Sequence, residues 1–283
     1  LTVSGNPSTT FASTTVNLGA SVVGISSGGN VTTGVINGSA TAAPFTFVKG
    51  GTSTLVLNAG NTGLSNATFD VQSGTLTAVS PASMGGSTTT QVSGGTLKLS
   101  STAGSPTYDV QVNAAAGITS TLTAGMAAGG ATGPLTIHQG GVNGLTVNNG
   151  ATLTLNTTDS YNLSIDGNVT LNGTSILTVG SALVNINNTG SATLTAASGS
   201  TINLSAGTLT TDHALSIYNL NITGGNLVQT GVLGPSKSLA VQSGGTLTIN
   251  NAAANLNLTG GATLSAPAAT LSLQSGTLTT DQA

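Results

Sequence analysis

The feature that most constrains this chain is a short phrase that returns along its length. In each copy a valine or leucine precedes one or two polar residues, then glycine, and then Thr-Leu with alternating residues after it. The clearest copies are 71–77, 92–99, 147–155, 241–249 and 273–279. Self-similarity of this kind is typical of repeat architectures, in which each copy is one structural unit stacked on its neighbours.

The phrase itself predicts a strand, a bend and a second strand. Thr-Leu-Thr-Leu at 152–155 alternates with a period of two, which indicates a half-buried strand with leucine inside and threonine outside. Threonine is β-branched and favoured on an exposed pleated face. The glycines before it mark a bend, because glycine adopts a positive φ without a Cβ clash.

The spacing of the copies predicts how the strands are arranged. Neighbouring leucines of the phrase lie 21, 18, 23 and 17 residues apart, in the pairs Leu76/Leu97, Leu153/Leu171, Leu171/Leu194 and Leu247/Leu264. Coils of about 20 residues suit a parallel β-helix, in which loops at the corners lengthen without disturbing the strands. We therefore expect an all-β protein, a parallel β-helix (β-solenoid) of roughly 14 coils.

The first part of the chain differs from the rest. Residues 1–47 lack the phrase and contain three of the four phenylalanines, Phe11, Phe45 and Phe47. One interpretation is an irregular first set of coils. The other is a cap or assembly segment that docks on a neighbouring subunit by strand addition, with these phenylalanines as its candidate contacts. We expect residues 48–283 to form the β-solenoid repeat domain.

The composition narrows the function classes. Charged residues make up 3% of the chain, against about 25% in typical domains. Disorder is the first alternative for so polar a chain, but 37% hydrophobic residues in alternating runs and a net charge of -3 argue against it. Three lysines cannot build the basic surface that nucleic acid requires. We expect an extracellular or cell-surface location, because a chain with few charges is poorly suited to a crowded cytoplasm.

The ends of the chain and its apolar runs add two expectations. No stretch approaches the 18 consecutive apolar residues of a membrane span. The chain begins at Leu1, without methionine, and stops within a copy of the phrase. We expect either a removed signal peptide or a fragment of a longer protein, and either truncation or head-to-tail stacking at the last coil.

One segment resembles a known family. Residues 49–63, KGGTSTLVLNAGNTG, followed by VQSGTL at 71–76, are similar to the autotransporter-associated β-strand repeat. Gly63 stands where that family usually has an aromatic residue, and the other copies match only the closing phrase. The resemblance implies a secreted right-handed β-helix, as in autotransporter passengers and giant surface proteins. It implies no particular activity.

Glycan-cleaving enzymes on β-helices are the enzyme alternative. Such sites need clustered carboxylates, with Arg or Lys to position the substrate. Here six aspartates are scattered, no two closer in sequence than Asp159 and Asp166, and the chain has neither Arg nor Glu. A separation of seven residues along a coil does not place two side chains at one point. We therefore expect no enzyme activity.

Other catalytic patterns are equally weak. Asp212 and His213 are adjacent, so in a strand they point to opposite faces and cannot act as orienter and base. His138 stands alone. Residues 24–28, GISSG, match the nucleophile-elbow pattern, which chance explains in a chain rich in Gly and Ser. We predict no catalytic, cofactor or metal site.

These observations favour a non-catalytic structural subunit or segment of an extracellular fibre, stalk or cell-surface filament. It would self-associate head-to-tail or laterally, through solenoid ends or strand addition. The alternative is an autotransporter-type adhesin passenger that binds glycans or surfaces through its Thr- and Asn-rich faces. The sequence does not separate the two.

Overall fold

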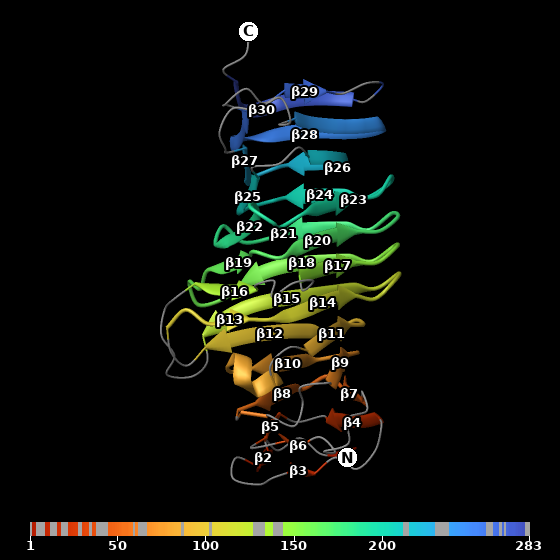
Figure 1. Ribbon diagram of the computed structural model, residues 1–283, viewed down its shortest axis with the longest axis vertical. Helices are drawn as coiled ribbons and strands as arrows, with labels where there is room; N and C mark the ends of the chain where they lie inside the picture. Colours follow the sequence, from red (N-terminus) through yellow and green to blue (C-terminus); the bar gives the residue numbers. More distant parts are fainter. Residues whose placement is uncertain are drawn as a thin grey trace.

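The chain folds as a parallel β-solenoid. The computed structural model describes residues 2–3, 9–11, 16–17, 22–27, 30–33, 36–37, 45–58, 60–61, 67–85, 88–101, 104–126, 134–137, 144–211, 215–229, 238–258, 263–265, 268 and 270–280. All strand pairs among them are parallel, and the coils rise along one axis from the N-terminal to the C-terminal end (Figure 1). These residues contain no α-helix and one 3-10 helix, η2 (Pro81–Met84). The predicted all-β parallel helix is confirmed.

The strands line three faces of the rod, which we call the first, second and third faces. The first face holds β1 (Thr2–Val3), β4 (Val22–Ser27), β7 (Phe45–Gly50), β9 (Ala67–Val71), β11 (Thr88–Val92), β14 (Val110–Ala114), β17 (Gly144–Val147), β20 (Asn168–Leu171) and β23 (Leu194–Ala196). The second face holds β2 (Thr9–Phe11), β5 (Val31–Thr33), β8 (Thr54–Leu57), β10 (Thr75–Ala78), β12 (Thr96–Ser101), β15 (Thr119–Met126), β18 (Thr152–Thr157), β21 (Ile176–Val179) and β24 (Thr201–Leu204).

The third face begins further along the chain. It holds β13 (Thr107–Tyr108), β16 (Leu135–Ile137), β19 (Leu163–Ile165), β22 (Val184–Asn188), β25 (Thr208–Thr211) and β27 (Asn226–Gln229). Three longer strands complete the second face and join it to its neighbours, namely β26 (Leu215–Ile222), β28 (Ser238–Leu258) and β30 (Thr270–Thr280). The short β29 (Thr263–Ser265) pairs with β28, and β3 (Val16–Asn17) pairs with β6 (Ile36–Asn37).

Alternation of burial explains why these segments are strands. In β18, Leu153 and Leu155 are fully buried, while Thr152 and Thr154 between them are half-buried. The same alternation recurs in strands on all three faces. The leucine-in, threonine-out reading of the repeated phrase is therefore confirmed.

The core consists of apolar columns that run along the rod, one residue from each coil. The longest, on the second face, contains Val31, Leu55, Leu76, Leu97, Leu122, Leu155, Val179, Leu204, Ile222, Ile249 and Leu273 in register. The third-face column contains Tyr108, Ile137, Ile165, Ile186, Leu209, Leu227, Leu256 and Leu278. Each coil therefore buries its apolar residues against the coils before and after it.

The predicted coil length and number are wrong. Ten steps along the second-face column lead from Val31 to Leu273, so 242 residues give about 24 per coil rather than 20. Single steps range from 18 residues, between Leu204 and Ile222, to 33, between Leu122 and Leu155. Longer coils mean fewer than fourteen of them. The sequence estimate was short because it counted the repeated phrase and not the third face or the insertions at corners.

Strands on both sides of the predicted domain boundary stack together. In the first face β4 pairs with β7, and β7 pairs with β9, so the boundary at residue 47 lies within β7. Strands of the N-terminal segment thus belong to the same face as those that follow. Whether residues 1–47 act as a separate cap stays a prediction.

Tyr108 is the first residue of the third-face column and lies in an apolar interior. Its hydroxyl donates toward the Ser100 carbonyl at 2.6 Å, and the Ala78 carbonyl lies 3.0 Å away. Burial raises the pKa of the Tyr108 hydroxyl far above its ordinary value of about 10. The folded chain therefore keeps this proton at a pH where the unfolded chain loses it.

This linkage predicts alkaline destabilisation. Above about pH 10 the unfolded state binds fewer protons than the folded state, so the free energy of unfolding falls by up to about 1.4 kcal/mol per pH unit. Urea midpoints measured from pH 9 to about 11.5 should fall more steeply for the wild type than for Tyr108→Phe, which lacks the titrating group. Equal slopes in the two proteins would contradict this role of Tyr108.

Candidate functional site

The outer surface of the second face carries a long row of small polar side chains. One outward position in each coil lies in register with the next over ten strands, occupied by Thr54, Thr75, Thr96, Thr121, Thr154, Thr178, Asn203, Asn221, Thr248 and Ser272. We call this the hydroxyl row. Neighbouring members are spaced by one strand separation, about 4.8 Å. The row gives the rod an uncharged face of donors and acceptors.

Side-chain amides join successive coils where asparagine replaces threonine on this face. The Asn203 amide donates to the Thr178 hydroxyl at 3.4 Å, and the Asn221 amide donates to Asn203 Oδ1 at 2.9 Å. In the adjacent row Asn219 donates to the Thr201 hydroxyl at 3.2 Å. These bonds run along the rod axis, so they add to the backbone ladders that hold the coils together.

The third face has a hollow of about 340 Å³. Its lining residues are Pro134, Asn162, Leu163, Ser164, Ala182, Leu183, Val184, Asn185 and Thr208. Three of them, Ser164, Asn185 and Thr208, occupy the same outward position in β19, β22 and β25. The hollow therefore extends across three successive coils, with one polar side chain from each.

A hydrogen-bonded cluster lies two residues further along the same strands. Asp166 Oδ1 accepts from the Ser164 hydroxyl at 2.7 Å and from the Asn187 amide at 2.6 Å. The Asn185 amide donates to Asn187 Oδ1 at 2.7 Å. We call Ser164, Asp166, Asn185 and Asn187 the third-face cluster. Each of its side chains is held in place by at least one of the others.

Lys49 is buried, although lysine is usually exposed. It faces inward from β7 in a column with Val71, and its Nζ donates to the carbonyls of Gly50 at 2.6 Å, Gly51 at 3.0 Å and Ser73 at 3.1 Å. An ammonium has three hydrogens, which matches three acceptors. Burial lowers the pKa of Lys49. The side chain fixes two adjacent corners and is not available to a ligand.

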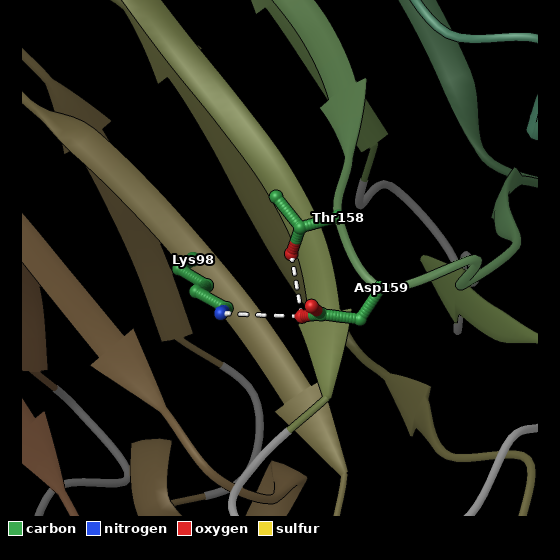
Figure 2. A network of polar contacts seen from close by, with 3 residues as sticks. All are labelled: Lys98, Thr158 and Asp159. Carbon is green, nitrogen blue, oxygen red and sulfur yellow. Dashed lines mark hydrogen bonds and ion pairs between the residues drawn. The ribbon is translucent and has the colours of Figure 1, made fainter.

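Lys98 forms the ion pair drawn in Figure 2. Its Nζ lies 4.0 Å from Asp159 Oδ2, and the Thr158 hydroxyl donates to the same oxygen at 3.0 Å. The two charged side chains are 26% and 52% exposed, so solvent screens the pair and its contribution to stability is at most about 1 kcal/mol. It links strand β12 with the corner after β18 and provides no chemistry.

The positions of these two lysines predict resistance to trypsin. Native digestion should give no fragment that ends at Lys49 or Lys98, because both lie in paired strands whose backbone must leave the ladder before cleavage. Both fragments should appear after unfolding in urea, as detected by mass spectrometry. Lys237 lies outside the described residues, so cleavage there does not bear on this prediction. Rapid native cleavage at Lys49 would contradict it.

The structure places the predicted assembly phenylalanines as follows. Phe47 is fully buried in β7, with its ring centroid 5.5 Å from that of Phe69 in the next coil. Its side chain therefore packs in the interior of its own chain. Phe11 ends β2 and Phe45 begins β7, but the surroundings of their side chains lie outside the described residues. The assembly role of Phe11, Phe45 and Phe47 stays a prediction.

The weak catalytic patterns fall in two places. Gly24 to Ser27 lie in β4, a strand that pairs on both sides, and not in a strand–turn–helix. His138, Asp212 and His213 lie outside the described residues. Within the part of the chain that the structure describes, no group of three metal-ligating side chains occurs, and no helix is long and apolar enough to span a bilayer.

Sequence reasoning missed the third-face cluster and the burial of Lys49. Ser164 and Asp166 are two residues apart, as are Asn185 and Asn187, and the two pairs are 21 residues apart. A spacing of two puts each pair on one face, and one coil of separation stacks them. That signal was present in the sequence. For Lys49, the alternation with Phe47 indicated an inward position.

Comparisons with known proteins leave the family open. No family model matches the chain, and searches of the curated proteins and of the solved structures found no match. The resemblance of residues 49–76 to the autotransporter-associated repeat therefore stays a prediction.

Proposed function

We propose that the chain is a non-catalytic structural segment or subunit of an extracellular fibre, stalk or cell-surface filament. The observation that carries this proposal is the second-face column, in which apolar residues stack in register from Val31 to Leu273. A rod of this kind has nearest-neighbour contacts only, so length is added coil by coil without a new core. The fold thus suits a spacer.

The outer surface supports the same function. The hydroxyl row presents neutral threonine, asparagine and serine side chains along the rod, and the ion pair Lys98–Asp159 is one of few charged features. A neutral polar skin keeps the apolar columns covered and offers little long-range repulsion to a second rod. Lateral or end-to-end contact between chains therefore meets a low electrostatic barrier.

The last described coil has features that favour end-to-end contact. β30 pairs with β28 on one edge, and among the described residues no strand pairs with its other edge. Leu273, a member of the second-face column, is 52% exposed there, whereas Leu247 of the preceding coil is fully buried. An open ladder edge and an uncovered leucine are what a stacked coil would cover, from this chain's continuation or from a neighbouring molecule.

Electron microscopy and sedimentation velocity test the proposal. The purified chain should form filaments or long end-to-end oligomers as its concentration rises. Leu273→Lys, which places a charge on the open edge, should shorten them while the circular dichroism spectrum stays unchanged. Leu183→Lys, an exposed leucine on the third face, is the matched control and should assemble like the wild type. A strictly monomeric wild type at high concentration would contradict the proposal.

A second candidate function is an adhesin passenger that binds glycans or surfaces. The observation that favours it is the hollow on the third face, with its preorganised polar cluster. The two functions are compatible, since a stalk can carry binding sites along its length.

A further inference from the structure

We propose that the hollow on the third face binds a neutral sugar unit of a polysaccharide. Its volume of about 340 Å³ lies within the range of small-molecule pockets, about 300–1,000 Å³. The floor presents the row Ser164, Asn185 and Thr208, whose ends are two strand separations apart, about 9.6 Å. A site that crosses coils in this way suits an extended chain running along the rod.

The chemistry of the lining matches a sugar. Hydroxyl groups of a sugar both donate and accept, and the asparagine, serine and threonine side chains of the lining do the same. The C–H surfaces of a sugar ring need apolar contacts, which Pro134, Ala182 and Leu183 provide at the rim. Leu183 is 37% exposed, one of few large apolar side chains on the surface. An exposed leucine beside convergent polar groups is the pattern of a binding site.

The third-face cluster supplies rigidity. Asp166 Oδ1 is engaged by Ser164 and Asn187, and Asn185 is held by Asn187, so these side chains are fixed before a ligand arrives. Preorganised groups lose less conformational entropy on binding, which increases affinity. The second oxygen of Asp166 accepts no hydrogen bond from the described residues. It is placed to accept a sugar hydroxyl in a charge-assisted bond.

A similar aspartate on the first face lacks this opening. Asp70 accepts from the Ser93 hydroxyl at 2.7 Å through Oδ1 and from the Gln72 amide at 2.8 Å through Oδ2. Both of its oxygens are therefore used within the protein. The contrast between Asp70 and Asp166 provides a matched control for the role of the open oxygen.

The charge of the lining selects against acidic sugars. Neither lysine nor arginine lines the hollow, and the carboxylate of Asp166 lies beside it. A uronic acid would meet repulsion and no counter-charge. The inferred ligand is thus a neutral hexose polymer, and the inference does not depend on whether the rod forms filaments.

Calorimetric titration with soluble cello-, malto-, manno- and galacto-oligosaccharides tests the inference, with oligogalacturonate as the acidic probe. At least one neutral probe should bind saturably, and Asp166→Asn and Asn185→Ala should each weaken its binding about tenfold. Asp70→Asn should bind like the wild type. Chemical-shift mapping with the same probe should place it at Leu183 and Asn185. Circular dichroism checks that each variant keeps its β-sheet signal.

Three results would overturn the inference. They are no binding of any neutral probe, tighter binding of oligogalacturonate, and equal losses in Asp166→Asn and Asp70→Asn. A chain that assembles into filaments yet binds no neutral sugar would overturn the sugar site and leave the structural function standing. A monomer that binds through Asp166 would do the reverse.

Discussion

Replacing Gly207 by alanine should destabilise the solenoid by about 3–5 kcal/mol, one of the largest effects expected of a single methyl group in this chain. Gly207 lies at the corner between β24 and β25 with a φ of +69°. A Cβ there would lie 2.5 Å from the Val184 carbonyl oxygen and 2.8 Å from that of Ser181. Both are backbone atoms of the preceding coil, so they cannot move without disturbing its strands.

Gly190→Ala is the matched control for this substitution. Gly190 has nearly the same φ, +65°, but a Cβ there would meet no atom within 4 Å. It should cost only the left-handed backbone strain, about 1–2 kcal/mol. Urea unfolding followed by circular dichroism measures both values. Equal losses at Gly207 and Gly190 would show that backbone strain alone matters and that the coils are not packed as closely as described.

Replacing Lys49 by methionine should cost about 2–4 kcal/mol. Methionine keeps most of the apolar volume but donates no hydrogen bonds, so the carbonyls of Gly50 and Ser73 lose the Nζ donor. Gly51 retains a bond from the Ser73 hydroxyl at 3.1 Å. Unsatisfied buried carbonyls are costly because water no longer solvates them.

Lys98→Met makes the same chemical change at an exposed position. Its ion pair with Asp159 is screened by solvent, so the free energy of unfolding should change by less than about 1 kcal/mol. The difference between the two variants isolates the effect of burial, and urea midpoints again provide the measurement. A stability of Lys49→Met at or above that of the wild type would mean that the buried ammonium is not a structural pin.

The strand pattern of this chain could be predicted because its periodicity is local. Thr-Leu-Thr-Leu at 152–155 specifies one inward and one outward face by itself, and the parallel fold follows from repetition. The coil length could not be predicted as well. Between Leu122 and Leu155 the chain inserts residues at a corner, and corner insertions leave the stacked register intact. Sequence spacing alone does not separate such an insertion from a coil of its own.

The candidate site was harder to predict because its parts come from different coils. Asp166 and Asn187 meet only when β19 and β22 stack in register, although each pair of polar residues alternates in the sequence. A search for paired carboxylates passes over a site made of one carboxylate and several amides. Lys49 was quoted as the start of a repeat, but its role as a donor to corner carbonyls depends on the path of the next coil.

Cysteine pairing across adjacent coils tests the stacked register most directly. The chain contains no cysteine, so Thr154→Cys combined with Thr178→Cys gives a clean background. These positions are register partners of β18 and β21, and a strand separation of about 4.8 Å lies within the Cα–Cα range of a disulfide. Mild oxidation should link this pair in the folded monomer, as measured by mass spectrometry. The pair Thr154→Cys and Asn203→Cys, two coils apart, should stay reduced. Failure of the first pair, or equal linking of both, would contradict the parallel solenoid described above.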